Sequence, residues 1–258
     1  MKKTLTAIII LVLIFSFVIV ASAGENSSSP DMTLDEYCES EDFSMEGLQR
    51  LFPEYYDECQ EAYARDAAQV KEIEANLDEM LAEGRREAEK DVKRNEAEPL
   101  VFNYPILGSI GDIIVELEMD SGSFGFAGHA AIVSKDSGLT VESYAKSFSP
   151  IGIDGVQFYK NQWGWKAGAL LIRPKNISSS VNPYRTAAQF AESKVDLPYN
   201  KNFFNKKTTS KYYCSQLVWQ AWLAAGIDIE KGTVPNGMIT PADIVNSSNT
   251  YIVNKVPD

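Results

Sequence analysis

Cys214 is the side chain with the clearest chemical potential, because it opens an apolar helical pattern in the last quarter of the chain. Counted from Cys214, apolar residues recur at offsets of 3, 4, 7, 8 and 11 positions, which predicts a helix with one buried face. A thiol in the first turn of a helix lies beside backbone N–H groups that have no partner within the helix, and these favour a thiolate. Cys214 is therefore a candidate nucleophile; the alternative is a small buried apolar side chain.

A cysteine nucleophile needs a base, and His129 is the only histidine in the sequence. It begins an apolar run typical of a strand. Glu142 lies on the next expected strand, where its carboxylate can face His129 across a hairpin and orient the imidazole. Taken alone, each also fits a plain structural role: His129 as an incidental surface residue, and Glu142 as the solvent-facing residue of an amphipathic strand.

A family resemblance rests on five short motifs, which occupy residues 111–114, 128–132, 141–143, 197–203 and 213–219. Their order places His129 before Glu142, and both before Cys214. This arrangement resembles the circularly permuted branch of the NlpC-type papain-like cysteine hydrolases, the YiiX/YebB/YaeF-like group, which is related to the lecithin retinol acyltransferase-like proteins. The resemblance covers about residues 100–245.

The resemblance implies an α+β fold, in which an antiparallel sheet packs against the nucleophile-bearing helix. It also implies hydrolysis of amide, peptide-like bonds through a thioacyl-enzyme, with Cys214, His129 and Glu142 as catalytic residues and no cofactor. Tyr199 and Ser215 are expected near the substrate or the oxyanion, and the alternative for Tyr199 is a packed core aromatic. With a single histidine, the usual histidine-rich zinc sites are excluded.

Two other functions are compatible with Cys214, His129 and Glu142. The protein could be a lipid thioesterase or acyltransferase that acts on a lipid amide or ester with the same three residues. It could also be a binding module that no longer catalyses a reaction. Trp163 and Trp165 either line a substrate groove or anchor loops. The net charge of −12 argues against a nucleic-acid partner.

The first residues indicate export. Lys2 and Lys3 precede an apolar stretch, and small residues at 21–23 suit cleavage, so residues 1–23 are expected to be a signal peptide. The alternative is an uncleaved membrane anchor. In either case the remainder is expected to be secreted or extracytoplasmic, where cell-envelope peptides are candidate substrates.

Residues 24–98 form a separate acidic helical segment, with 23 acidic and 8 basic residues, whereas residues 99–258 are nearly neutral and form the expected catalytic domain. An apolar stripe runs from Tyr56 to Ala88 at helical spacing. We expect this helix to dock on its own domain or to mediate self-association. Cys38 and Cys59 lie in this segment, and outside the cell they are expected to form a disulfide.

Overall fold

The computed structural model describes residues 32–40, 42–90, 105–120, 127–177, 182–230 and 237–258. The expected signal peptide at residues 1–23 and the expected boundary at residues 98–99 lie outside this part of the chain. Thr33–Asp258 form one compact unit, so the acidic helices and the sheet belong together. Among the helices of the described ranges, none has the length and apolarity needed to cross a membrane.

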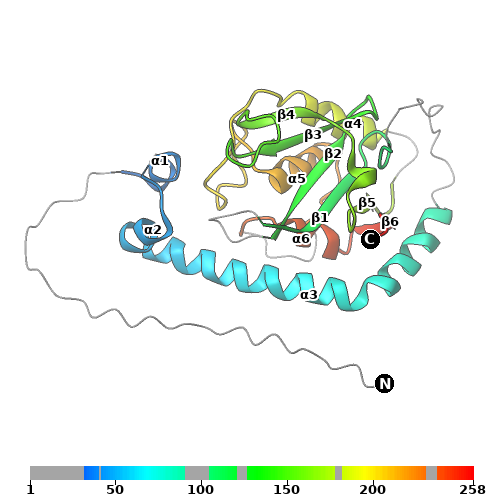
Figure 1. Cartoon of the computed structure of the whole chain (residues 1–258), viewed down its shortest axis with the longest axis horizontal. Coiled ribbons are helices and arrows are strands. Elements are labelled where there is room, and N and C mark those ends of the chain that lie inside the picture. The colour runs from blue at the N-terminus through cyan, green and yellow to red at the C-terminus, as the bar shows by residue number, and fades with distance from the viewer. Residues whose placement is uncertain (1–31, 41, 91–104, 121–126, 178–181, 231–236) are drawn as a thin grey trace, which may run out of the picture. The chain divides into compact units, whose positions relative to one another are not determined.

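An antiparallel sheet forms the centre of this unit, with the spatial strand order β4-β3-β2-β1-β5-β6 (Figure 1). Alternate side chains of each strand point to opposite faces, which gives the sheet two apolar layers. Together with the helices, the sheet confirms the expected α+β class. The strands are β1 (Ile113–Asp120), β2 (Ala127–Val133), β3 (Leu139–Tyr144), β4 (Gly155–Lys160), β5 (Leu170–Pro174) and β6 (Thr250–Lys255).

Three helices cover one face of the sheet: α4 (Pro183–Glu192), α5 (Cys214–Ala224) and α6 (Pro241–Asn246). Two of them begin where the sequence supplies a cap followed by proline. The Asn182 side chain accepts the Arg185 N–H, and Thr240 forms a capping box with Asp243. The opposite face carries a smaller apolar layer that includes Trp163, from the short helix η2 (Trp163–Trp165).

The acidic segment forms α1 (Leu34–Glu39), α2 (Met45–Leu51) and the long helix α3 (Pro53–Lys90) (Figure 1). The apolar stripe of α3 packs on the core of the sheet: Ile73 is only 1 % exposed and belongs to the same apolar cluster as Ile252 of β6. Gly84 meets β6 so closely that a Cβ atom added there would lie 1.7 Å from the Ile252 carbonyl oxygen. The stripe thus has an intramolecular partner, and self-association through α3 stays a prediction.

Gly84→Ala tests this packing by the sign of its effect. In an exposed helix, replacing glycine by alanine stabilises by about 1 kcal/mol. At Gly84 the added methyl group must displace β6, so we expect the free energy of unfolding to fall by about 1–3 kcal/mol. Denaturant unfolding measures the change, and Asn76→Ala, at an exposed position of α3, is the matched control. A more stable Gly84→Ala protein would contradict the docking of α3.

Candidate active site

Cys214 is the first residue of α5, as the apolar pattern predicts. The helix is fixed by side chains that are fully buried against the sheet, among them Leu217, Val218 and Trp222. It ends at Ala224 with Ala225 as its C-cap, and the left-handed Gly226 (φ = 85°) follows. The helix start is therefore held in place by the core, while Cys214 as a residue is only half-buried.

A network of amide side chains fixes the chain that leads to Cys214. The Gln216 Oε1 atom accepts hydrogen bonds from the Tyr213 backbone N–H (3.1 Å) and from Asn200 Nδ2 (3.0 Å). The Gln216 Nε2 atom donates to the carbonyl oxygens of Lys206 and Thr208. Because Gln216 is fully buried, it ties the loop before the nucleophile to the first turn of α5.

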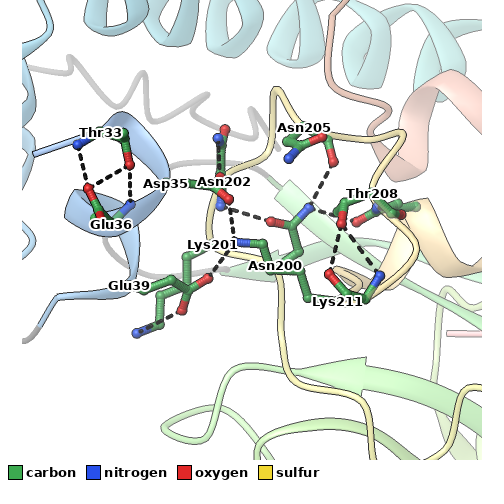
Figure 2. Close-up of polar contacts among 12 residues, drawn as sticks. Thr33, Asp35, Glu36, Glu39, Asn200, Lys201, Asn202, Asn205, Thr208 and Lys211 are labelled. Carbon is green, nitrogen blue, oxygen red and sulfur yellow. Dashed lines mark hydrogen bonds and ion pairs between the residues drawn. The ribbon is translucent and has the colours of Figure 1, made fainter.

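The acidic helix α1 lies against the same loop, as Figure 2 shows. The Lys211 ammonium group contacts the carboxylates of Asp35 (3.2 Å) and Glu39 (3.0 Å). Asn202 Nδ2 donates to the other Asp35 oxygen at 2.7 Å. Two acidic residues of the N-terminal segment, Asp35 and Glu39, thus bind the loop that precedes Cys214.

His129 lies on β2 with only 3 % of its surface exposed. The preceding Gly128 has φ = 98°, and a Cβ atom there would lie 2.3 Å from the Glu116 carbonyl oxygen of β1. Only glycine therefore fits at the position before His129, where the backbone is left-handed and close to β1. The pairing of β2 with β3 runs through Ile132 and Val133 and does not extend to His129.

Glu142 of β3 accepts a hydrogen bond from His129, with 2.9 Å between Nε2 and Oε2. Its carboxylate, 2 % exposed, also accepts from the Tyr144 hydroxyl (2.9 Å), the Trp163 indole N–H (3.1 Å) and the Thr140 hydroxyl. These further donors are absent from the sequence-based site. Thr140 and Tyr144 share the alternation of β3 with Glu142, which is a usable signal, whereas no local pattern links Trp163 to it.

The imidazole ring is also held by aromatic stacking. The Tyr144 ring lies 4.0 Å from the His129 ring, with 13° between the planes, and the Trp163 ring is almost parallel at 6.1 Å. Trp163 is therefore a buried anchor at the site. Trp165 is 64 % exposed, so the interpretation of this residue as a buried anchor is wrong.

The charges of the three side chains stabilise one another. Burial by itself lowers the pKa of His129, but the Cys214 sulfur and the Glu142 carboxylate outweigh it and raise this pKa to about 9. Burial by itself raises the pKa of Cys214, but the hydrogen-bonded His129 and the N–H groups of Ala130 and Ser215 lower it below its usual value. The pKa of Glu142 is likewise lowered by His129 against the effect of burial. The site therefore favours a thiolate, an imidazolium and a carboxylate.

The structure places Tyr199 and Ser215 differently. Burial and then the nearby Cys214 raise the pKa of Tyr199 well above its usual value, so its phenol stays neutral beside the sulfur. The Ser215 hydroxyl instead donates to the Ile239 carbonyl oxygen at 2.7 Å, which anchors α5. The Ser215 backbone N–H approaches the Cys214 sulfur, and the Ser215 hydroxyl oxygen accepts a weak hydrogen bond from that sulfur at 4.0 Å.

The expected disulfide between Cys38 and Cys59 is not present: both residues are free thiols. They line one small apolar space between the N-terminal helices and the loop before α5. Burial raises the pKa of Cys38 to about 11 and that of Cys59 to about 12, so both stay protonated and unreactive. Their spacing along the chain brings both to one small apolar space, where they remain free thiols.

Direct titration of His129 tests the charge arrangement. As the only histidine, it gives imidazole NMR signals that need no further assignment, and we expect a pKa near 9. Cys214→Ala and Glu142→Gln each remove a negative partner, so both should lower this pKa toward about 6.5. Cys38→Ala, which removes a distant thiol, is the control. A wild-type pKa near 6.5 would refute the ion pair.

Comparison with known proteins agrees with this geometry. Residues 114–249 match the family described as permuted papain-like amidase enzymes, YaeF/YiiX, C92 family, and this range includes His129, Glu142 and Cys214. The uncharacterized protein YycO of Bacillus subtilis (strain 168) is 40 % identical over 84 residues, which are 31 % of this chain and 33 % of that protein. The chain thus aligns with only a third of the length of that relative. No solved structure matches the chain. The family match spans more than half of the sequence, and the chain belongs to the permuted papain-like amidases of the C92 family, which are cysteine hydrolases.

Proposed function

We propose that the protein is an exported cysteine hydrolase that cleaves peptide-like amide bonds through a thioacyl-enzyme. The observation that carries the proposal is the contact of His129 with Glu142 on one side and with the Cys214 sulfur on the other. In this arrangement Cys214 is the nucleophile, His129 the general acid and base, and Glu142 the group that orients the imidazole.

Acylation follows from the charges of the site. The Cys214 thiolate attacks the carbonyl carbon of the amide, and the carbonyl π electrons move to oxygen. The N–H groups of the first turn of α5 are suitably placed to stabilise this oxyanion, to which the neutral Tyr199 hydroxyl is a further candidate donor. As the oxyanion collapses, the C–N bond breaks and the His129 imidazolium gives its proton to the leaving amine.

Deacylation reverses the role of the imidazole. Neutral His129 takes a proton from water, whose oxygen attacks the thioester carbon. Collapse of the second tetrahedral intermediate breaks the C–S bond and releases the carboxylic acid. The sulfur leaves as a thiolate beside the imidazolium, which restores the resting ion pair. Throughout, Glu142 keeps its negative charge and stabilises the imidazolium.

Export to the cell envelope or the exterior is part of the proposal and is supported by the sequence of residues 1–23. Peptides of the envelope are then the substrates within reach. N-terminal sequencing of the protein from fractionated cells tests this part, and a cytoplasmic protein that begins at Met1 would refute it.

A lipid amide or ester is the second candidate substrate. A groove of about 480 Å³ beside Glu142 and Tyr144 combines apolar side chains (Pro150, Ile151 and Phe158) with charged ones (Glu116, Lys160 and Lys166), and such a lining suits an amphipathic acyl substrate. Hydrolysis and acyl transfer share the thioester, so the acceptor distinguishes them. In water enriched in oxygen-18, a hydrolase incorporates the label into the released acid, whereas an acyltransferase moves the acyl group to an added alcohol or amine.

Alkylation by iodoacetamide should separate the three cysteines. At neutral pH we expect Cys214 to react first, because its pKa is lowered while burial keeps Cys38 and Cys59 protonated. Peptide mass mapping over time gives the three rates. His129→Ala should slow the labelling of Cys214 and leave the other two unchanged. Equal rates at all three positions would refute an activated Cys214.

The pH dependence of amide cleavage should be bell-shaped. Below the lowered pKa of Cys214 the sulfur carries a proton, so kcat/KM rises as that proton is lost. Above a pH of about 9 His129 loses the proton that the leaving amine requires, so kcat/KM falls again. Initial rates with a chromogenic peptide amide give the profile. His129→Ala should lower kcat/KM about a hundredfold or more and remove the alkaline limb.

Trapping of the intermediate tests the mechanism itself. Mass spectrometry of the intact protein, quenched in acid during turnover, should show one acyl group on wild-type protein and none on Cys214→Ala. An active Cys214→Ala protein would overturn the proposed function. An active His129→Ala protein with near wild-type turnover would exclude the Cys–His mechanism.

A further inference from the structure

The loop before α5, residues 200–211, is closed at its base beside the nucleophile. It contains no helix or strand, and a bridge between Tyr199 and Tyr212 joins the chain on its two sides. In this bridge the Asn200 N–H donates to the Tyr212 carbonyl oxygen at 3.1 Å. Tyr199 lies near the Cys214 sulfur, and Tyr212 lies two positions before Cys214. The conformation of the loop therefore determines where Tyr199 lies relative to Cys214.

Asn200 connects the start of this loop to the first turn of α5. Its fully buried side chain accepts the Asn202 N–H at Oδ1 (3.1 Å) and donates from Nδ2 to Gln216 Oε1 (3.0 Å). The same Gln216 oxygen accepts the N–H of Tyr213, the residue before Cys214. A displacement of Asn202 is thus passed on to the backbone at the nucleophile.

Phe203 forms a second connection between the loop and the site. Its ring packs edge-on against the Tyr213 ring, with 5.2 Å between the centroids, and against the Tyr199 ring at 6.3 Å. Phe203 directly follows Asn202 in the chain. A shift of Asn202 therefore also moves a ring that contacts the tyrosine before Cys214 and the tyrosine near its sulfur.

One carboxylate, that of Asp35 in α1, holds both ends of the loop (Figure 2). Oδ1 accepts from Asn202 Nδ2 (2.7 Å) near the start of the loop, and Oδ2 accepts from Lys211 Nζ (3.2 Å) at its end. The Asn202 hydrogen bond lowers the pKa of Asp35 most; burial acts in the opposite direction, and Lys211 lowers this pKa further. Asp35 is therefore ionised at neutral pH and holds both donors at once.

The start and the packing of α1 fix the position of Asp35. Thr33 forms a capping box with Glu36, in which each side chain accepts the backbone N–H of the other residue (Figure 2). Tyr37 is only 4 % exposed, and its hydroxyl donates to the Ser44 carbonyl oxygen at 3.2 Å. The Asp35 side chain itself is 44 % exposed, so it can be replaced without a change in the core.

We infer that Asp35 is a positioning residue of the active site. Through Asn202 and Lys211 it holds the loop before α5 in the conformation that aligns the oxyanion donors with the sulfur. The inference rests on the proposed function, because it assigns Asp35 a part in acylation. Donors stabilise an oxyanion only at hydrogen-bond distance, so even a small displacement lowers the rate.

The charge of the sulfur has a different origin from the alignment of the donors. Against the effect of burial, the pKa of Cys214 is lowered by His129 and by the N–H groups of Ala130 and Ser215. None of these three residues belongs to the loop before α5. Loss of the Asp35 contacts should therefore leave the thiolate in place while it impairs stabilisation of the oxyanion.

Two reagents that react with Cys214 separate these effects. With p-nitrophenyl acetate the thiolate attacks the ester carbonyl, an oxyanion forms, and its collapse expels p-nitrophenolate. Iodoacetamide is alkylated on sulfur by direct displacement of iodide, without an oxyanion. We expect Asp35→Ala to lower the single-turnover rate of p-nitrophenolate release about tenfold. The rate of alkylation of Cys214, followed by peptide mass mapping, should stay close to that of the wild type.

Graded variants identify the contact that acts. Asp35→Asn keeps an oxygen acceptor for Asn202 but loses the ion pair with Lys211, so it should be acylated faster than Asp35→Ala. Combining Asp35→Ala with Asn202→Ala should lower the rate little more than the stronger single substitution, because both remove the same contact. Asp57→Ala, at an exposed position of α3, is the matched control and should react as the wild type does. Circular dichroism and thermal unfolding verify that each variant is folded.

Two results would overturn the inference while the proposed function stands. The first is a wild-type rate of acylation in Asp35→Ala. The second is an equal loss of acylation and alkylation in that variant, which would indicate a general loosening of the structure. A different result would refute the proposed function, and the inference with it: acylation of the wild type no faster than that of Cys214→Ala.

Discussion

The rest of the site depends on one buried charge, the carboxylate of Glu142. Removal of a carboxylate from water costs several kcal/mol unless donors replace the lost hydration. Thr140, Tyr144 and Trp163 supply three neutral donors, and His129 supplies a charged one. Because the neutral donors compensate much of the burial, the negative charge persists and raises the pKa of the imidazole. Activation of Cys214 therefore requires that β2, β3 and the short helix η2 all meet at Glu142.

The principal residues of this arrangement are predictable from the sequence because each has a local signal. A helical apolar stripe marks the position of Cys214, the sole histidine identifies the base, and strand patterns give the α+β class. Glu142 follows from its place on the neighbouring strand. The supporting donor Trp163 is not predictable, because its distance from Glu142 along the chain corresponds to no secondary-structure period. Its role depends on how the loop after β4 folds back over the sheet.

Two expectations differ from the structure. The spacing of Cys38 and Cys59 predicts that helices bring them together, and both line one small apolar space, but they remain free thiols. Trp163 and Trp165 are two positions apart, so they have nearly the same neighbours in the sequence. Even so, Trp163 is buried and Trp165 is exposed. For the tryptophans, the sequence determines proximity along an element, whereas burial is decided by segments that are distant in the chain.

The permuted order of the three residues has a structural consequence for the N-terminal segment. Catalytic geometry depends on where side chains meet and not on their order in the chain, so α5 can follow the sheet and still present Cys214 to His129. In this order, however, a long irregular loop leads to the nucleophile and needs support at its exposed side. Lys211 of that loop is held by Asp35 and Glu39 of α1 (Figure 2). Gln216 holds the buried side of the loop. The ion pairs of α1 thus join the N-terminal helices to the segment before Cys214, while the apolar stripe of α3 packs them on the sheet as part of one compact unit.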